Sequence, residues 1–158
     1  MARDPDARWA DLSGRIEAGK HILALRVYHE DTDFTGLVYH ANYLKFCERG
    51  RSDFLRVSGI GQSELFAGEG GKEPAAFVVR HMDVDFLKPA RMDDVLEIVT
   101  QVDELGAAVM TLLQHVTRDG VVLVTLRVKI VLVSASGKPR RLGPLVRSSL
   151  ERFVNQEG

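Results

Sequence analysis

The chain has one cysteine, no long apolar run and almost no net charge. Cys47 has no second cysteine with which to form an intrachain disulfide. The longest apolar run, Ala75 to Val79, has five residues, whereas a membrane-spanning helix needs about 20. With 21 Lys plus Arg against 22 Asp plus Glu, the chain has no general attraction for nucleic acid or an anionic membrane. We therefore expect no nucleic-acid partner and no transmembrane segment.

The first ten residues carry Arg3, Asp4, Asp6 and Arg8 and lack the apolar core of a signal peptide. This feature and the scarcity of cysteine predict a cytoplasmic protein. No internal repeat or low-complexity tract divides the 158 residues, so one domain is expected. We predict a polar N-terminal extension over 1–20, a folded domain over 21–146 and a C-terminal tail over 147–158.

Apolar residues with helical spacing predict one long amphipathic helix over about residues 40–57. They recur at offsets of three, four, seven and eleven, namely at Tyr43, Phe46, Cys47, Gly50 and Phe54. Ser58-Gly59 follows as a stop signal, because glycine accepts the left-handed conformation that ends many helices. A short helical turn is expected around Gln62 to Phe66.

Alternation of apolar and polar residues predicts strands before and after this helix. The first contains Leu23, Leu25 and Val27, and the others lie beyond Pro74. Turns are expected at 103–106 and at 118–120, where Arg118-Asp119-Gly120 is a strong hairpin signal. The pattern indicates an α+β fold in which an antiparallel sheet curls around one helix. Because such a sheet leaves an exposed edge, we predict a homodimer.

The segment between the first strand and the helix is the best candidate for a reactive site. It places Glu30, Asp31 and Asp33 beside a helix N-terminus, whose unpaired backbone amides suit an oxyanion. Gly36 permits a tight turn or a close approach to a ligand. A carboxylate facing such amides could attack a polarised carbonyl or activate water toward it.

Two other interpretations of this segment need no catalysis. Short acidic side chains often hydrogen-bond local amides, so Asp31 and Asp33 could simply shape the turn. Alternatively, Asp31, Asp33, Thr35 and Gly36 match positions 1, 3, 5 and 6 of a calcium-binding EF-hand loop. Position 12 would then be Asn42 instead of glutamate, and a strand instead of a helix precedes the loop. We therefore expect no metal site.

The segment also carries the signature Asp-x-Asp-x-x-Gly-x-Val-Tyr-x-x-x-Tyr, followed by Glu48-Arg49 and later by Asp85-Phe86-Leu87-Lys88-Pro89-Ala90 and Asp93-Asp94. With these motifs the chain closely resembles the acyl-coenzyme A thioesterases associated with the bacterial Tol-Pal system. These belong to the 4-hydroxybenzoyl-coenzyme A thioesterase branch of the hot-dog fold. The resemblance extends to about Arg141. It departs at Phe34 and Thr35, where relatives often have smaller residues.

The resemblance implies an acyl-coenzyme A hydrolase with the hot-dog fold, assembled as a homodimer or homotetramer with active sites between subunits. It implies no cofactor beyond the coenzyme A of the substrate. By motif position, Asp33 is the catalytic carboxylate, and the backbone amide of His40 polarises the thioester carbonyl. The imidazole of His40 could also act as an acid or base, or simply pack at the helix start. Motif residues expected to bind substrate are Gly36, Val38, Tyr39 and Asn42.

Coenzyme A phosphates require cations, and Lys88, Arg91 and Arg140 are the candidates, although charged loop residues are usually only solvated. A rival catalytic carboxylate is Glu48, because another hot-dog branch places its carboxylate on the central helix. Lys45 and Arg51 lie within reach of Glu48 on a helix, which makes a structural ion pair the simpler interpretation.

Two other functional classes remain open. A hot-dog dehydratase would act on a hydroxyacyl thioester through His40, and a non-catalytic acyl-coenzyme A binding or scaffold protein would not need Asp33. The resemblance also implies cooperation with phospholipid-synthesis proteins at the inner membrane.

Overall fold

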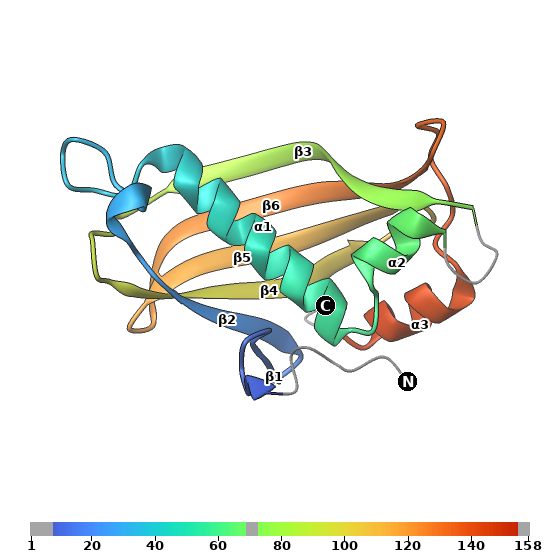
Figure 1. The fold of residues 1–158 in the computed structure, drawn as a ribbon, viewed down its shortest axis with the longest axis horizontal. Helices are drawn as coiled ribbons and strands as arrows, with labels where there is room; N and C mark the ends of the chain where they lie inside the picture. The colour runs from blue at the N-terminus through green and yellow to red at the C-terminus, as the bar shows by residue number, and fades with distance from the viewer. Residues whose placement is uncertain (1–7, 69–72, 155–158) are drawn as a thin grey trace.

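A computed structural model of the chain describes residues 8–68 and 73–154. Six strands form a single sheet in the order β1-β2-β4-β5-β6-β3, and every pairing is antiparallel. The helix α1 crosses one face of this sheet (Figure 1). The elements in chain order are β1 (Arg15–Glu17), β2 (Lys20–Arg26), the 3-10 turn η2 (His29–Asp31), α1 (His40–Val57), α2 (Gln62–Ala67), β3 (Ala75–Phe86), β4 (Val95–Leu105), β5 (Val109–Arg118), β6 (Val121–Ser134) and α3 (Pro144–Glu151).

The predicted helix over 40–57 is confirmed, and its apolar positions face the sheet. It lies close against β4 at Gly50, where an added Cβ would be 2.6 Å from Cγ2 of Ile98. Ser58 ends the helix, and its hydroxyl donates to the carbonyl of Phe54 at 2.7 Å. Gly59 then turns the chain at a φ of +86°. Gly50, in the middle of α1, has no side chain and lets the helix lie directly on the sheet.

The alternating strand pattern predicted beyond Pro74 is also confirmed. Residues at alternate positions of β4, β5 and β6 are almost fully buried beneath α1, among them Leu96, Ile98, Val102, Met110, Leu112, Val116, Leu126 and Val128. The hairpin between β5 and β6 turns at Asp119 and Gly120, which both have positive φ. The expected α+β plan of a sheet wrapped on one long helix is therefore what the chain adopts.

The turn expected at 103–106 was placed too early. Strand β4 continues through Asp103 to Leu105, and its register shifts at a bulge between Val102 and Glu104. The chain reverses only at Gly106, whose amide donates to the carbonyl of Val109 at 2.8 Å. A bulge interrupts the alternation of side chains between the two faces, so the polar residues after Val102 resembled a turn in sequence.

Both predicted terminal segments contribute to the folded body where the structure describes them. Strand β1 lies within the extension predicted over 1–20 and pairs with β2. The boundary predicted at 146/147 falls inside α3, which buries Leu150 completely. The ring of Phe153 then packs against Phe54 of α1 at a centroid distance of 5.2 Å. Leu150 lies within α3 and Phe153 just beyond its end, and both side chains are buried in the core.

Candidate active site

The loop before α1 is fastened to the helix by a buried carboxylate. Asp31 is only 4% exposed; its Oδ2 accepts a hydrogen bond from the amide of Tyr28 at 2.8 Å, and its Oδ1 accepts one from Nδ2 of Asn42 at 3.0 Å. The amide of Tyr39 donates to the carbonyl of Asp31 at 2.9 Å. Asp31 therefore sets where the loop meets the first turn of α1. The side chain of Asn42, predicted to bind substrate, is turned inward to Asp31.

Asp33 lies at the start of a tight turn and points its carboxylate at Thr35. Its Oδ1 accepts hydrogen bonds from the hydroxyl of Thr35 at 2.5 Å and from the amide of Thr35 at 2.8 Å. The amide of Gly36 donates to the carbonyl of Asp33 at 3.0 Å, and Gly36 has a φ of +81°. The hydrogen bonds from Thr35, and more weakly the nearby His40, lower the pKa of the Asp33 carboxyl. Asp33 is therefore ionised at neutral pH.

Helix α1 begins without a side-chain cap. The residue before it, Tyr39, has an extended backbone and no capping hydrogen bond. The amides of Val38 and Tyr39 are satisfied by the carbonyls of Ala90 and Asp31. Within the described residues, the amides of His40 and Ala41 have no acceptor. These two donors, together with the positive end of the helix dipole, can receive a carbonyl oxygen that becomes negative during a reaction.

Asp33 and the start of α1 line one open groove of about 280 Å³. Its apolar wall is the ring of Phe86, which lies 5.9 Å from the ring of Tyr43 and 6.0 Å from that of His40. The position of the Tyr43 ring is fixed by its hydroxyl, which accepts a hydrogen bond from the amide of Ala90 at 2.8 Å. The groove is lined by Asp33, Thr35, Leu37, Val38, His40, Tyr43, Phe86, Leu87, Lys88 and Pro89.

The three predicted phosphate-binding cations do not come together in one chain. Lys88 lines the groove, and Arg91 follows it in the same loop, where its backbone pairs with Leu37. Arg140 instead follows β6 and donates to the carbonyl of Glu73, just before β3, at 2.6 Å. Figure 1 shows this end of the sheet opposite the loop that carries Asp33. The structure thus brings Lys88 and Arg91 toward Asp33 and leaves Arg140 at the far end.

Glu48 lies on the exposed outer surface of α1, away from the groove. The ion pair predicted between Glu48 and Lys45 or Arg51 is absent from residues 8–68 and 73–154. Arg51 is instead buried against the sheet and donates to Oε1 of Gln114 at 3.0 Å. The expected ion pair does not form at contact distance, because Arg51 reaches a partner on β5, which helix spacing does not reveal. Glu48 acts on Arg51 only from a longer range, where it opposes the lowering of the Arg51 pKa by burial.

The two carboxylates on which the calcium interpretation depends are engaged in hydrogen bonds within the protein. Both carboxylate oxygens of Asp31 accept hydrogen bonds from the protein, while Asp33 is tied to Thr35. In the part of the chain that the structure describes, no group of three or more His, Cys, Asp or Glu side chains is arranged to hold a metal. The same residues include no helix that is both long and apolar enough to cross a membrane.

Sequence reasoning gave no site role to six residues that line the groove, among them Thr35, Tyr43 and Phe86. A threonine two residues after an aspartate is typical of a turn closed by side-chain hydrogen bonds, so Thr35 had a recognisable signal. Tyr43 and Phe86 looked like ordinary core positions, and only the packing of α1 beside the end of β3 brings their rings to the site.

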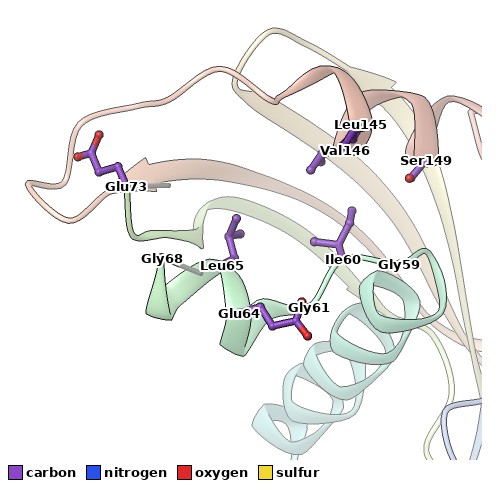
Figure 2. A pocket seen from close by; sticks show the side chains of 10 residues that line it. All are labelled: Gly59, Ile60, Gly61, Glu64, Leu65, Gly68, Glu73, Leu145, Val146 and Ser149. Carbon is purple, nitrogen blue, oxygen red and sulfur yellow. The ribbon is translucent and has the colours of Figure 1, made fainter. Parts of the chain in front are cut away.

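A second pocket of about 230 Å³ lies at the far end of the sheet, between the end of α1, α2 and α3. Figure 2 shows Ile60, Leu65 and Val146 around its apolar interior, with the carboxylate of Glu73 away from it. None of the predicted catalytic residues lines this pocket. The reactive groups therefore belong to the groove at the start of α1.

Comparison with known proteins places the chain among thioesterases. A family model described as "Thioesterase superfamily" matches residues 35–125. The acyl-CoA thioester hydrolase YbgC of Escherichia coli is 40% identical over 120 residues, which are 75% of this chain and 86% of that protein. The acyl-CoA thioesterase YbgC of Helicobacter pylori is 47% identical over 94 residues, which are 60% of this chain and 65% of that protein, slightly under two thirds.

Solved structures confirm the predicted hot-dog fold. The crystal structure of a probable thioesterase from Bartonella henselae superposes with a TM-score of 0.75 and is 46% identical. The match covers 78% of this chain and 99% of that one. The sheet and its central helix are therefore shared along nearly the whole length of that protein.

Proposed function

The chain belongs to the thioesterase superfamily, and we propose that it hydrolyses acyl-coenzyme A to a carboxylic acid and free coenzyme A. The proposal rests on one observation: an ionised carboxylate, that of Asp33, and an uncapped helix N-terminus line the same groove. The similarity to the E. coli protein named as an acyl-CoA thioester hydrolase supports the same substrate class. The apolar wall at Phe86 suits an acyl group.

In this mechanism the thioester carbonyl lies against the first amides of α1. The amide of His40 donates to the carbonyl oxygen and stabilises the negative charge of the tetrahedral intermediate. Asp33 either attacks the carbonyl carbon with its own carboxylate oxygen or takes a proton from a water whose oxygen attacks it. The carbon–sulfur bond then breaks, and the thiolate of coenzyme A leaves and is protonated by solvent. Attack by water gives the carboxylic acid at once, whereas direct attack leaves a mixed anhydride of Asp33 and the acyl group, which a water molecule hydrolyses to the acid and free Asp33. A single turnover in ¹⁸O-labelled water identifies direct attack when the first acid product lacks ¹⁸O and Asp33 gains it, because this outcome requires that water hydrolyse the anhydride at the Asp33 carbonyl.

The remaining contacts with substrate follow from the groove. We assign the phosphate groups of coenzyme A to Lys88 and Arg91, which lie in the loop beside Asp33. Gly36, Val38 and Tyr39 would contact substrate through the backbone that leads into α1. Arg140 lies at the other end of its own chain, so it can take part only if a second subunit brings it there.

We also propose that the protein works as a homo-oligomer. Strand β3 is the long outer strand of the sheet, and Val78 and Val79 on it are 43% and 48% exposed. A second copy pairing along β3 would satisfy the free backbone groups of this edge. Sedimentation at micromolar concentration should show a dimer or tetramer. A single species of 17.6 kDa would contradict the proposal.

The cellular setting is proposed on narrower grounds. A cytoplasmic location is supported by Cys47, which is buried and unpaired. The sequence motifs further suggest a link to the Tol-Pal system and to phospholipid-synthesis proteins at the inner membrane. Affinity purification from cells that contain the tagged protein, with the Asp33→Asn variant in parallel, tests such partners independently of catalysis.

The activity is tested by replacing the two rival carboxylates. Asp33→Asn keeps an oxygen that can accept the hydrogen bonds of Thr35, so the fold should persist while kcat falls roughly 10²-fold or more. Glu48→Gln is the matched control and should turn over like the wild type, because Glu48 lies outside the groove. Thiol release is measured with short, long and aromatic acyl-coenzyme A substrates. Loss of activity in Glu48→Gln alone would overturn the assignment.

Product analysis separates hydrolysis from the other candidate classes. Mass spectrometry of a reaction with a 3-hydroxyacyl thioester should show the free acid and coenzyme A. An unsaturated thioester would indicate a dehydratase. Binding without turnover of any acyl-coenzyme A, unchanged in Asp33→Asn, would indicate a non-catalytic binding protein.

A further inference from the structure

Among the described residues, Thr35 is the only one whose side chain hydrogen-bonds to the carboxylate of Asp33. Its hydroxyl and its amide both donate to the same oxygen, Oδ1, at 2.5 Å and 2.8 Å. No described residue donates to Oδ2. We propose that Thr35 is a positioning residue that occupies Oδ1 and thereby leaves Oδ2 as the reacting oxygen of Asp33. This inference rests on the proposed role of Asp33 in hydrolysis.

Asp33 needs a positioning residue because few other contacts restrain its side chain. The next side chain, Phe34, is fully exposed in the described part of the chain and so does not hold Asp33 in place. An aspartate in an exposed turn would otherwise rotate freely about its side-chain bonds and would lose that freedom each time a substrate is attacked. Two hydrogen bonds to one oxygen remove this rotation before substrate arrives. Gly36 closes the turn, since its left-handed backbone allows its amide to bond back to the carbonyl of Asp33.

The two hydrogen bonds also make the two carboxylate oxygens chemically different. Each donor withdraws electron density from Oδ1, which weakens that oxygen as a base or nucleophile. Oδ2 accepts no hydrogen bond from a described residue and therefore remains the better base or nucleophile. The charged or titratable groups that share the groove are His40 and Tyr43 on α1 and Lys88 in the loop after β3. Their influence on Asp33 stays the same when Thr35 alone is changed.

The test compares two threonines of the same loop. Thr35→Val keeps the shape and the amide but removes the hydroxyl that bonds to Asp33. Thr35→Ser keeps a hydroxyl. Thr32→Val is the matched control, because the hydroxyl of Thr32 donates to the carbonyl of His29 at 2.8 Å and does not contact Asp33. Each variant is assayed for kcat and KM at pH 7, and the carboxyl carbon of Asp33 is titrated by ¹³C NMR, with Asp33→Asn used to assign the signal.

Thr35→Val should lower kcat roughly 10-fold with little change in KM, because the carboxylate is misplaced but the binding surface is intact. The NMR titration of Asp33 should move to higher pH, since the hydroxyl hydrogen bond lowers the pKa of this carboxyl in the wild type. Thr35→Ser should restore both properties, and Thr32→Val should change neither. A residue that only stabilised the fold would alter unfolding without moving the Asp33 titration.

The outcomes separate this inference from the proposed function. If Asp33→Asn is inactive while Thr35→Val has the kcat and the Asp33 titration of the wild type, the positioning role of Thr35 is wrong and the hydrolase mechanism stands. If Asp33→Asn retains full activity, the proposed function itself fails. If Thr35→Val lowers kcat equally in an Asp33→Asn background, Thr35 acts on something other than Asp33, which also overturns the inference.

Discussion

Gln114 is a buried polar side chain between α1 and the sheet, and its removal gives the most quantitative test of the fold. It lies on β5 and is 1% exposed. Its Oε1 accepts a hydrogen bond from Arg51 at 3.0 Å, and its Nε2 donates to the carbonyl of Cys47 and to the hydroxyl of Thr100, each at 2.9 Å. One side chain therefore connects two turns of α1 to β4 and β5.

Gln114→Met preserves length and volume but removes all three hydrogen bonds. The lost bond to the charged Arg51 should cost about 1.5–3 kcal/mol, and the one to Thr100 about 1 kcal/mol. The Cys47 carbonyl is affected less, because it also lies inside α1 and can accept the ordinary helical bond. We expect the free energy of unfolding to fall by about 3 kcal/mol, a large share of the roughly 5–15 kcal/mol typical of a folded domain.

The double variant Arg51→Met/Gln114→Met should be more stable than the sum of the single changes predicts. Replacing both partners by apolar side chains leaves no buried charge without a partner, so much of the loss should be recovered. The assay is urea unfolding followed by circular dichroism, at one fixed protomer concentration because an oligomer is expected. Additive losses within about 0.5 kcal/mol would refute the coupling between Arg51 and Gln114.

Two further predictions concern buried titratable groups. Burial lowers the pKa of His21, whose Nδ1 has no partner among the described residues, so the folded state favours the neutral ring. The wild type should therefore lose stability as the pH falls below the ordinary histidine pKa of about 6.5. The urea midpoints measured at pH 7 and pH 5 should differ more in the wild type than in His21→Gln. Equal differences in the two proteins would contradict this prediction. Burial also raises the pKa of the Cys47 thiol to about 12, so native protein at pH 8 should react with iodoacetamide about 10³-fold more slowly than a free thiol. Rapid labelling without urea would show that α1 separates from the sheet.

Local patterns in the chain predicted the long helix and the main strands and singled out a candidate site, but they did not predict β1 or α3. The helix over 40–57 follows from apolar spacing of 3.6 residues, and the strands beyond Pro74 follow from a period of two. Asp33 and Gly36 could be singled out because a carboxylate and a flexible residue stand just before a helix start. These features depend on residues that are only a few positions apart. Over that range the spacing of residue types is sufficient to indicate the local backbone conformation.

Tertiary structure alone decided which side chains face one another across elements. Asn42 turns inward to Asp31 instead of toward the groove, and Arg51 bonds to Gln114, which is 63 residues away in the chain. Arg140 lies at the opposite end of the sheet from Asp33. Such pairings depend on strand order, on the bulge in β4 and on the depth at which α1 rests on the sheet. Those quantities are set by the packing of the whole core, because no short segment contains both partners of a long-range contact.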